Sequence, residues 1–483
     1  MTARHTPDRP LMKESPLMRP PRLLAAVLLV LASSAPGPSG APQEIDFTKA
    51  GAEGLEHLKA LVRLDTSNPP GNESRAAAYL AETLRAAGLE PRILESEPGR
   101  GSLLVRYRGA GTKRPLLIMS HIDVVPVERE GWSVPPFDAI VKDGFLWGRG
   151  TLDDKGMAAA ELETMLLLAR NRVRLSRDVV FLAEADEEAG GAKGMDWLLE
   201  HHADLFDAEL ALNEGGRVIR SDGKPRYVAV QTTEKIYQDF TVVARGTAGH
   251  SSIPVGDNPI DRLVRALDRI GTLAFPPRLN PVTRAFFTGL VSALPPELSG
   301  CVGRLEDPQA GPRCFETLSA APNFNAMLRT TCTPTILKAG YKENVIPSEA
   351  RANLNCRILP GTDLDTFLAG LREGAADPKV EVIFARDPRP SPGPSSTDSP
   401  LYRAIETVAR RVAPGIAVVP YMSPGGTDSQ VLRQRGIAAY GLLPFPIEEE
   451  DLRTMHANDE KIAVDAFTWG TRMLYQVVLE TAR

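Results

Sequence analysis

The chain alternates short apolar runs with amphipathic stretches from about residue 45 onward, a pattern that predicts an α/β fold. Apolar runs at residues 116–120, 179–183 and 210–212 are expected to be strands, and residues 156–169 have the periodicity of a helix. Polar residues follow each of these runs. Because open α/β sheets place their sites beyond the carboxyl ends of strands, a functional site is expected at that edge.

The middle of the chain carries a different pattern. The expected elements are strands at 237–245, 326–333, 350–359 and 380–385 and helices at 257–270 and 363–375. Their order, β-α-β-β-α-β, is typical of a ferredoxin-like unit. A Pro-rich stretch at residues 274–322 separates the first helix from the second strand and is expected to be a functional or loosely ordered loop.

These patterns, together with the length of 483 residues, predict two domains. We expect an α/β catalytic domain built from residues 44–235 and 389–483. A ferredoxin-like α+β lid or dimerisation domain is expected as an insertion at residues 236–388. The formal net charge of −5, without a basic stripe, argues against a nucleic-acid partner.

Residues 1–43 are expected to be a signal peptide and linker rather than part of the fold. Arg19 and Arg22 precede an apolar run at residues 23–32, and small residues, Pro and Gly follow it. The run is about ten residues long, which is short for a bilayer span. The pattern predicts export, periplasmic or secreted, with a membrane anchor as the alternative if the leader stays uncleaved. No stable membrane partner is expected beyond that leader.

The four cysteines lie outside the acidic motifs, at Cys301, Cys314, Cys332 and Cys356. Export would permit disulfides, and a bond between Cys301 and Cys314 would close a short loop. The pairing cannot be read from the sequence, and four free thiols are the alternative.

Five short motifs together supply the donors of a two-metal hydrolase site. They contain His121 with Asp123, Asp153 with Asp154, Asp186 with Glu187 and Glu188, Asn213 with Glu214, and His456. Imidazole nitrogen and carboxylate oxygen suit zinc, cobalt or manganese. Hydrolysis also needs a carboxylate that is not a ligand, to take a proton from water, and the adjacent acids at 186–188 can divide these roles.

Each motif taken alone has an ordinary structural explanation. A histidine and an aspartate after a strand can be a polar strand end, and paired acids often complement a helix dipole. Asp153 can cap a helix. The remaining histidines were excluded as candidates: His5 lies in the leader, His57 in an early helical pattern, and His201 and His202 on a solvated helix face.

The ordered set of motifs resembles the M20 family of metallopeptidases. The segments that carry the resemblance are residues 121–123, 148–156, 186–188, 214–216 and 247–252 and His456. The resemblance covers about residues 45–483. The leader, the Asn-Glu-Gly-Gly form at residues 213–216 and the long insert are most similar to the carboxypeptidase S and N-acyl-amino-acid hydrolase branch.

The resemblance implies a zinc-peptidase-like catalytic domain that holds two divalent ions, zinc in the first place, with cobalt or manganese as alternatives. Asp153 would bridge both ions. The ligands of the first ion would be His121 and Glu214, and those of the second Glu188 and His456. Glu214 is preferred to Asn213 because amide oxygen binds zinc poorly. The peptide bond after Asp153 is expected to be cis.

The resemblance also implies roles outside the metal ligands. Glu187 would be the general base and would later give its proton to the leaving amine, while Asp123 would support His121. His250 of the lid would stabilise the oxyanion after lid closure, and in dimeric relatives it comes from the partner subunit. The substrate carboxylate would be held by Asn344, Arg357, Gly426 and Thr427. An ordinary turn histidine, a surface ion pair and a tight turn are the respective alternatives.

The resulting hypothesis is hydrolysis of an amide bond next to a free carboxylate in a small peptide, by a carboxypeptidase or dipeptidase. The alternative is an aminoacylase-like N-acyl-amino-acid deacylase, and a non-catalytic peptide-binding protein is a distant third. The acyl pocket is expected to be walled by residues 274–322 and 440–446. There, Phe275, Phe286 and Phe287 indicate an apolar acyl group or belong to the core. Lid pairing predicts a homodimer, unless the insert caps the lid edge and leaves a monomer.

Overall fold

A computed structural model describes residues 44–389 and 391–483. The predicted signal peptide and linker at residues 1–43 lie outside the described residues. Within the described part of the chain, the helices fall short of the length and apolar character that a membrane span requires.

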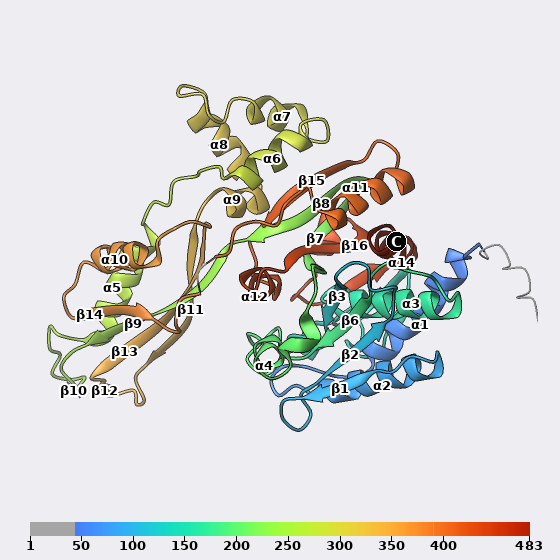
Figure 1. Cartoon of the computed structure of the whole chain (residues 1–483). Coiled ribbons are helices and arrows are strands. Elements are labelled where there is room, and N and C mark those ends of the chain that lie inside the picture. The colour runs from blue at the N-terminus through green and yellow to red at the C-terminus, as the bar shows by residue number, and fades with distance from the viewer. Residues whose placement is uncertain (1–43, 390) are drawn as a thin grey trace, which may run out of the picture. The chain divides into compact units, whose positions relative to one another are not determined.

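An eight-stranded mixed sheet carries most of the fold (Figure 1). Its order is β1 (Arg92–Glu95), β2 (Gly101–Tyr107), β6 (Val179–Glu184), β3 (Leu116–His121), β7 (Leu210–Ser221), β16 (Ala438–Ile447), β8 (Lys224–Glu234) and β15 (Ala417–Ser423). The strands expected from 116 and 179 are confirmed, whereas the run at 210–212 is only the start of the longer β7. Strands β3, β6, β7 and β16 run parallel, so their carboxyl ends share one edge.

Helices cover both faces of this sheet because successive strand residues point to opposite sides. Leu116 and Ile118 pack into one apolar cluster, whereas Leu117 and Met119 pack into another. The first cluster is covered by α1 (Phe47–Val62), α2 (Glu73–Ala86), α3 (Lys155–Arg170), α11 (Pro400–Val412) and α14 (Val464–Ala482). The second is covered by α4 (Met195–His201) and α12 (Ser429–Gln434). The helix expected at 156–169 is therefore confirmed as α3.

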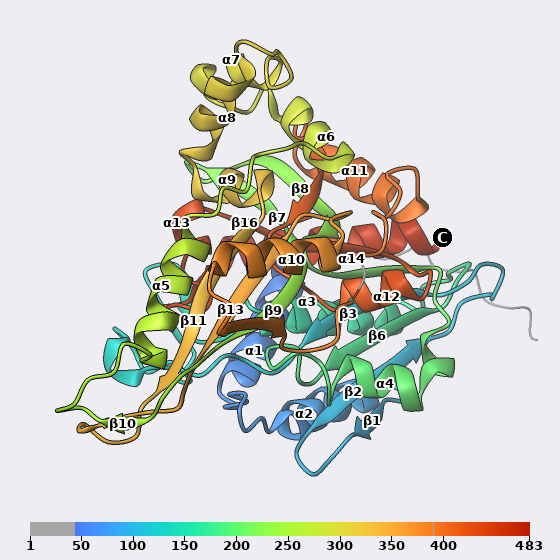
Figure 2. The ribbon, with the colours of Figure 1, turned by 90° about the vertical axis from the view of Figure 1, so that its left-hand side faces the viewer.

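A second sheet, of four antiparallel strands, forms the lid (Figure 2). Its order is β11 (Thr331–Ala339), β13 (Glu349–Ile358), β9 (Ile236–Arg245) and β14 (Val380–Phe384). Helices α5 (Pro259–Gly271) and α10 (Leu364–Ala375) pack on it and close an apolar core separate from that of the large sheet. The predicted ferredoxin-like order is confirmed, although residues 326–328 belong to a helix rather than to the second strand.

The stretch at residues 274–322 is helical, so its interpretation as a loosely ordered loop was wrong. It contains α6 (Pro281–Leu290), α7 (Pro296–Val302), α8 (Gly311–Ser319) and the start of α9 (Pro322–Leu328). Each of these helices has proline at its first or second position. Proline fits the first turn of a helix, because the N–H group that it lacks would have no partner within the helix there, and a Pro-rich sequence can therefore be helical. Phe286 and Phe287 are core residues of a cluster that packs against β15.

Two disulfides connect elements of this region, Cys301 with Cys314 between α7 and α8, and Cys332 with Cys356 between β11 and β13. All four cysteines are therefore paired. The smaller elements are β4 (Ile140–Lys142), β5 (Phe145–Trp147), β17 (Lys461–Ala463), β10 (Gly249–His250), β12 (Val345–Ile346), α13 (Glu449–Leu452) and short 3-10 turns at Arg129–Gly131 and Ala203–Phe206.

Candidate active site

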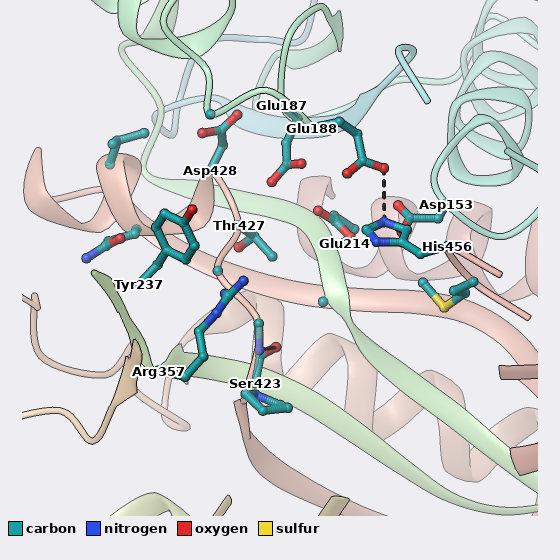
Figure 3. Close-up of a pocket in the computed structure, with 18 of the residues that line it drawn as sticks. Asp153, Glu187, Glu188, Glu214, Tyr237, Arg357, Ser423, Thr427, Asp428 and His456 are labelled. Atoms are coloured by element: carbon teal, nitrogen blue, oxygen red, sulfur yellow. Dashed lines mark hydrogen bonds and ion pairs between the residues drawn. The ribbon is translucent and has the colours of Figure 1, made fainter. Parts of the chain in front are cut away.

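A cavity of about 660 Å³ lies where the carboxyl ends of the parallel strands face the lid sheet. Figure 3 shows the side chains of Asp153, Glu187, Glu188 and Glu214 converging on one part of it, with Arg357 approaching from the lid side. The sequence pattern predicted a site at this sheet edge, and the structure brings the acidic motifs together there.

Asp153 is the centre of the acidic group because two sets of potential ligands share it. His121 Nε2 lies 2.9 Å from Asp153 Oδ1, and His456 Nε2 lies 3.0 Å from Asp153 Oδ2. His456 Nε2 also lies 3.1 Å from Glu188 Oε1. One set is His121, Asp153 and Glu214 and the other is Asp153, Glu188 and His456, with donor atoms within 4.8 Å of one another in each set. The two sets could hold two cations that share one carboxylate.

The donor types fit this reading. Each set offers one imidazole nitrogen and two carboxylate oxygens, which suits zinc and similar ions. Burial and the neighbouring Asp153 carboxylate raise the pKa of Glu214 well above its usual value. Crowded carboxylates of this kind are costly without positive charge between them. Asn213 instead donates a hydrogen bond to Ser429 Oγ, so the geometry favours Glu214 as the donor.

Asp123 connects His121 to the acidic segment that follows β6. His121 Nδ1 lies 3.0 Å from the Asp123 carbonyl oxygen and 3.4 Å from Asp123 Oδ1. The Asp123 carboxylate also accepts hydrogen bonds from the backbone N–H groups of Glu187 and Glu188 and from Asn68 Nδ2. Asp123 therefore positions the imidazole and the acidic segment relative to each other.

Glu460 holds the loop that presents Asp153. Its buried carboxylate accepts hydrogen bonds from the backbone N–H groups of Gly150, Leu152 and Asp153. Arg149 pairs with Glu460 at 2.7 Å and donates to the Ala457 carbonyl oxygen. This network connects the Asp153 loop to the segment that carries His456. The Asp153–Asp154 peptide bond is cis, as the resemblance implied.

Glu187 lines the cavity without belonging to either ligand set. Burial raises its pKa well above the usual value, and the neighbouring carboxylates of Asp428 and Glu188 act in the same direction against the opposing effect of His121. Burial and nearby acids also raise the pKa of Asp428, to about 7. A half-buried carboxylate beside two ligand sets is in the place that a proton-transferring group would need.

Arg357 brings a positive charge to the opposite side of the cavity. Its guanidinium lies 4.4 Å from the ring centre of Tyr237, and its Nε donates to Asn355 Oδ1 at 3.3 Å. Burial lowers the pKa of Arg357 from its ordinary value. Among the described residues Arg357 has no carboxylate partner, so its planar fork is available to an anionic ligand.

The loop at residues 425–428 also lines the cavity, but most of its donors are already used. Thr427 donates through both its N–H and its hydroxyl to Glu234 Oε2, and the Gly425 N–H donates to Ser423 Oγ. Glu234 is a buried carboxylate that needs such donors, which explains the arrangement. Gly426 lies against Arg357, with the guanidinium 3.7 Å from the position of an added Cβ.

His250 and Asn344 do not line the cavity. Both are exposed at the tip of the lid, where β10 pairs with β12 and the Ser251 N–H donates to the Asn344 carbonyl oxygen. The Nδ1 atom of His250 accepts from the Ser252 N–H and lies 2.7 Å from the Ser252 hydroxyl. A single chain therefore brings Arg357 of the lid to the same cavity as the metal-ligand motifs. His250 and Asn344, which are also lid residues, remain outside that cavity.

The predicted acyl pocket needs a further correction. Leu443, from the segment at 440–446, lines the cavity, but Phe275, Phe286 and Phe287 do not. Phe275 packs at the edge of the lid core. Sequence reasoning also missed Glu460, Asn68 and Tyr237, because a single polar residue without a motif gives no signal of its distant partner.

Comparison with known proteins identifies the relatives of this chain. The family model for peptidase family M20/M25/M40 matches residues 117–480. The chain is 31% identical to human N-fatty-acyl-amino acid synthase/hydrolase PM20D1 over 385 residues, covering 76% of this chain and 74% of that protein. It is 28% identical to probable carboxypeptidase S-like 2 of Dictyostelium discoideum, covering 79% and 75%.

A solved structure shows the same fold. The M20 family metallo-carboxypeptidase Sso-CP2 from Sulfolobus solfataricus matches with a TM-score of 0.68 at 19% identity, over 89% of this chain and 99% of that one. The likeness confirms the predicted fold class, an α/β domain with a lid.

Proposed function

Because this chain belongs to the peptidase family M20/M25/M40 and is a hydrolase, we propose that it cleaves an amide bond adjacent to a free carboxylate in a small substrate. The observation that carries the proposal is that one cavity contains two ligand sets that share Asp153, together with Arg357, which has no carboxylate partner in the described part of the chain. Carboxypeptidase or dipeptidase action is the first candidate.

Two divalent cations, zinc in the first place, would be held by the set His121, Asp153 and Glu214 and the set Asp153, Glu188 and His456. Such ions polarise a carbonyl and increase the acidity of water when bound. Cobalt or manganese would suit the same donors. The support for this assignment is the mixed nitrogen and oxygen donor set and the crowding of buried carboxylates.

Within the chain, Glu187 would move the proton. Its carboxylate lies free of both ligand sets and faces the cavity, so it would accept a proton from water and later give it to the leaving amine. Asp123 would act as a positioning residue for His121, through the contacts of its carbonyl and carboxylate oxygens with Nδ1.

Arg357 would bind the carboxylate of the substrate. A guanidinium recognises a carboxylate through two parallel hydrogen bonds, and the ring of Tyr237 lies against this one. Gly426 lines the same part of the cavity, so an added side chain there would contact Arg357 and Tyr237. Thr427 would contribute less than the resemblance implied, since Glu234 already occupies its donors.

N-acyl-amino-acid deacylation is the second candidate. The cavity wall next to His456 contains Leu443, Leu452 and Met455, an apolar surface that fits an acyl chain better than a charged peptide terminus. The human relative at 31% identity is named for N-fatty-acyl-amino acids. Both candidates require the same amide and the same carboxylate.

One experiment separates the candidates. The protein is stripped with a chelator, reloaded with zinc, cobalt or manganese, and assayed on dipeptides, N-acyl amino acids and the carboxamide form of each. We expect turnover that disappears and returns with metal and that requires the free carboxylate. Faster turnover of N-acyl amino acids would select the second candidate, and equal turnover of the carboxamides would contradict the proposal.

We also propose that the protein works as a homodimer through the lid. The support is that His250 lies outside the cavity of its own chain, while the lid exposes apolar side chains at Ile253, Leu337 and Tyr341. Exposed apolar groups are common at sites of association when they form a patch. A partner subunit, or closure of the lid, would then bring His250 to the substrate.

Export is proposed as well. The two disulfides support it, because such bonds persist mainly in oxidising compartments. Expression of the full chain in a bacterial host, followed by N-terminal sequencing of the periplasmic protein, tests the proposal. A start near residue 44 is expected, and an intact leader on cytoplasmic protein would contradict it.

A further inference from the structure

A second group of metal-binding side chains lies between α1 and α3, away from the cavity. Glu53 and His57 are four residues apart on α1 and therefore share one face of that helix. Glu163 faces them from α3. One donor atom from each of the three residues lies within 4.8 Å of the others. Gly54 lies beside the group, and an added Cβ there would be in ordinary contact with Glu163 Cβ, at 3.5 Å.

The buried polar atoms of this group lack hydrogen-bond partners within the described part of the chain. Glu163 is fully buried, and neither of its carboxylate oxygens has such a partner. His57 Nε2 is also buried without one. Buried carboxylate and imidazole groups are normally satisfied, so three orphaned donor atoms that face one another indicate that something binds between them.

We propose that Glu53, His57 and Glu163 form a zinc site separate from the active site. One imidazole and two carboxylates are common zinc ligands, and a water would complete four-coordination. In a tetrahedral site, ligand atoms about 2.0–2.2 Å from the ion lie about 3.3–3.6 Å from one another. Donor atoms within 4.8 Å of one another would therefore move closer by up to about 1.5 Å when the ion binds, through rotation of the side chains. Glu53 is half-exposed and gives the ion a path from solvent.

The surroundings of His57 fit this role. Its Nδ1 lies 2.7 Å from the Tyr79 hydroxyl on α2. If Nδ1 carries the proton and donates it to that hydroxyl oxygen, Nε2 keeps its lone pair and points at the carboxylates. Histidine ligands usually have such a partner on the second nitrogen, which sets the tautomer.

The guanidinium of Arg170 lies next to this group, but it does not form hydrogen bonds with both of the carboxylates. It forms a two-pronged ion pair with Glu53 but lies 3.8 Å from Glu163 Oε1, too far for a hydrogen bond. Two carboxylates face one guanidinium, which pairs with Glu53, so Glu163 lacks a hydrogen-bonded cation among the described residues. Burial accordingly raises the pKa of Glu163 to about 8. Arg170 is itself half-exposed and can turn toward solvent when an ion enters.

The site is distinct from the active site along the same helix. Asp154 precedes the first turn of α3, and Glu163 lies nine positions further, about 13 Å along the helix axis. An ion here would join α1 to α3, whose first residue is separated from Asp153 by Asp154 alone. It would therefore stabilise the fold without touching the substrate.

The test compares zinc content between matched proteins. Wild type, His57→Gln, Glu163→Gln and the control His201→Gln are dialysed against zinc, and zinc per chain is counted by elemental analysis. His201 is exposed on α4, so its variant should match wild type. We expect each of the first two variants to carry one zinc fewer, with hydrolytic activity and circular dichroism unchanged.

The difference in zinc content decides the proposal whatever the active site binds. Equal zinc content in wild type and both variants would overturn the proposal. The Glu163 carboxyl would then be neutralised by a proton rather than by a metal ion. If His57→Gln fails to fold, the zinc content of Glu163→Gln and the zinc affinity of Tyr79→Phe still test the proposal. Tyr79→Phe keeps all three ligands and should weaken the zinc of this site about 10- to 100-fold, measured by competition with a zinc indicator. Unaltered binding in both would contradict the proposal.

Discussion

Two groups of histidine and carboxylate lie in different settings within residues 44–389 and 391–483. The Asp153 group stands on loops at strand ends and opens into a cavity with Arg357, whereas the Glu53–His57–Glu163 group is enclosed between two packed helices. Loops can present several donors to an outside ligand, because their backbone need not pack on a neighbour. Helix faces bring donors together only where the helices touch. The same residue types therefore suit catalysis in one place and structural binding in the other.

The largest effect is expected from a substitution in the cavity that contains the Asp153 group. Glu187→Gln should lower kcat by about 10²- to 10⁴-fold, because the amide cannot accept a proton. Metal content should stay at the wild-type value, since Glu187 belongs to neither ligand set. Steady-state kinetics and elemental analysis measure both. The exposed Glu200→Gln variant is the control, and full activity in Glu187→Gln would remove the general-base assignment.

The next substitution tests whether the lid supplies a residue to the active-site cavity. The Glu53–His57–Glu163 group has no such contribution to test. His250→Ala should lower kcat by about 10²- to 10³-fold, as expected for loss of one oxyanion donor. If the donor comes from the partner subunit, mixing inactive His250→Ala and Glu187→Gln chains should restore part of the activity. Rates of the mixture against those of the separate variants provide the measurement. No recovery in a sedimenting dimer would assign His250 to its own chain.

A smaller effect is expected from substitution of Arg357, which brings a positive charge to the side of the cavity opposite the Asp153 group. Arg357→Lys keeps the charge but loses the planar fork, so KM for free-carboxylate substrates should rise about 10- to 100-fold. Carboxamide substrates should be little affected. The ratio of kcat/KM between the two forms of one substrate is the measurement. An unchanged ratio would mean that the carboxylate binds elsewhere.

The smallest effect concerns the helix group and leaves activity intact. In metal-free protein the raised pKa of Glu163, about 8 against an ordinary 4.5, means that the folded state holds a proton which the unfolded state releases. Stability should therefore fall as pH rises from about 4.5 to about 8, by on the order of a few kcal/mol. Glu163→Gln should lose most of this slope while Glu53, His57 and Arg170 remain. Thermal unfolding across that pH range measures it, and parallel curves would contradict the assignment.

Much of the pocket could be predicted because its residues stand in dense, ordered motifs. Asp153 precedes a recognisable helix, Glu188 follows a recognisable strand, and Glu214 follows the apolar run that begins β7, and parallel strands place such residues at one edge. The helices at residues 281–328 could not be predicted in the same way, because the prolines that begin them resemble those of a loop. His57 is not a candidate from the sequence, since it stands in a helical pattern, and Glu163 lies over a hundred positions away.

The sequence by itself determined the alternation of strands and helices, the inserted lid and the reaction class, because these depend on local periodicity and on contiguous motifs. Only the tertiary structure decided that Glu460 holds the Asp153 loop, that Glu234 occupies the donors of Thr427, and that His250 lies outside its own cavity. The physical reason is that buried polar groups must find partners wherever packing brings them. Those partners are chosen by contact in space and leave no mark in the local sequence.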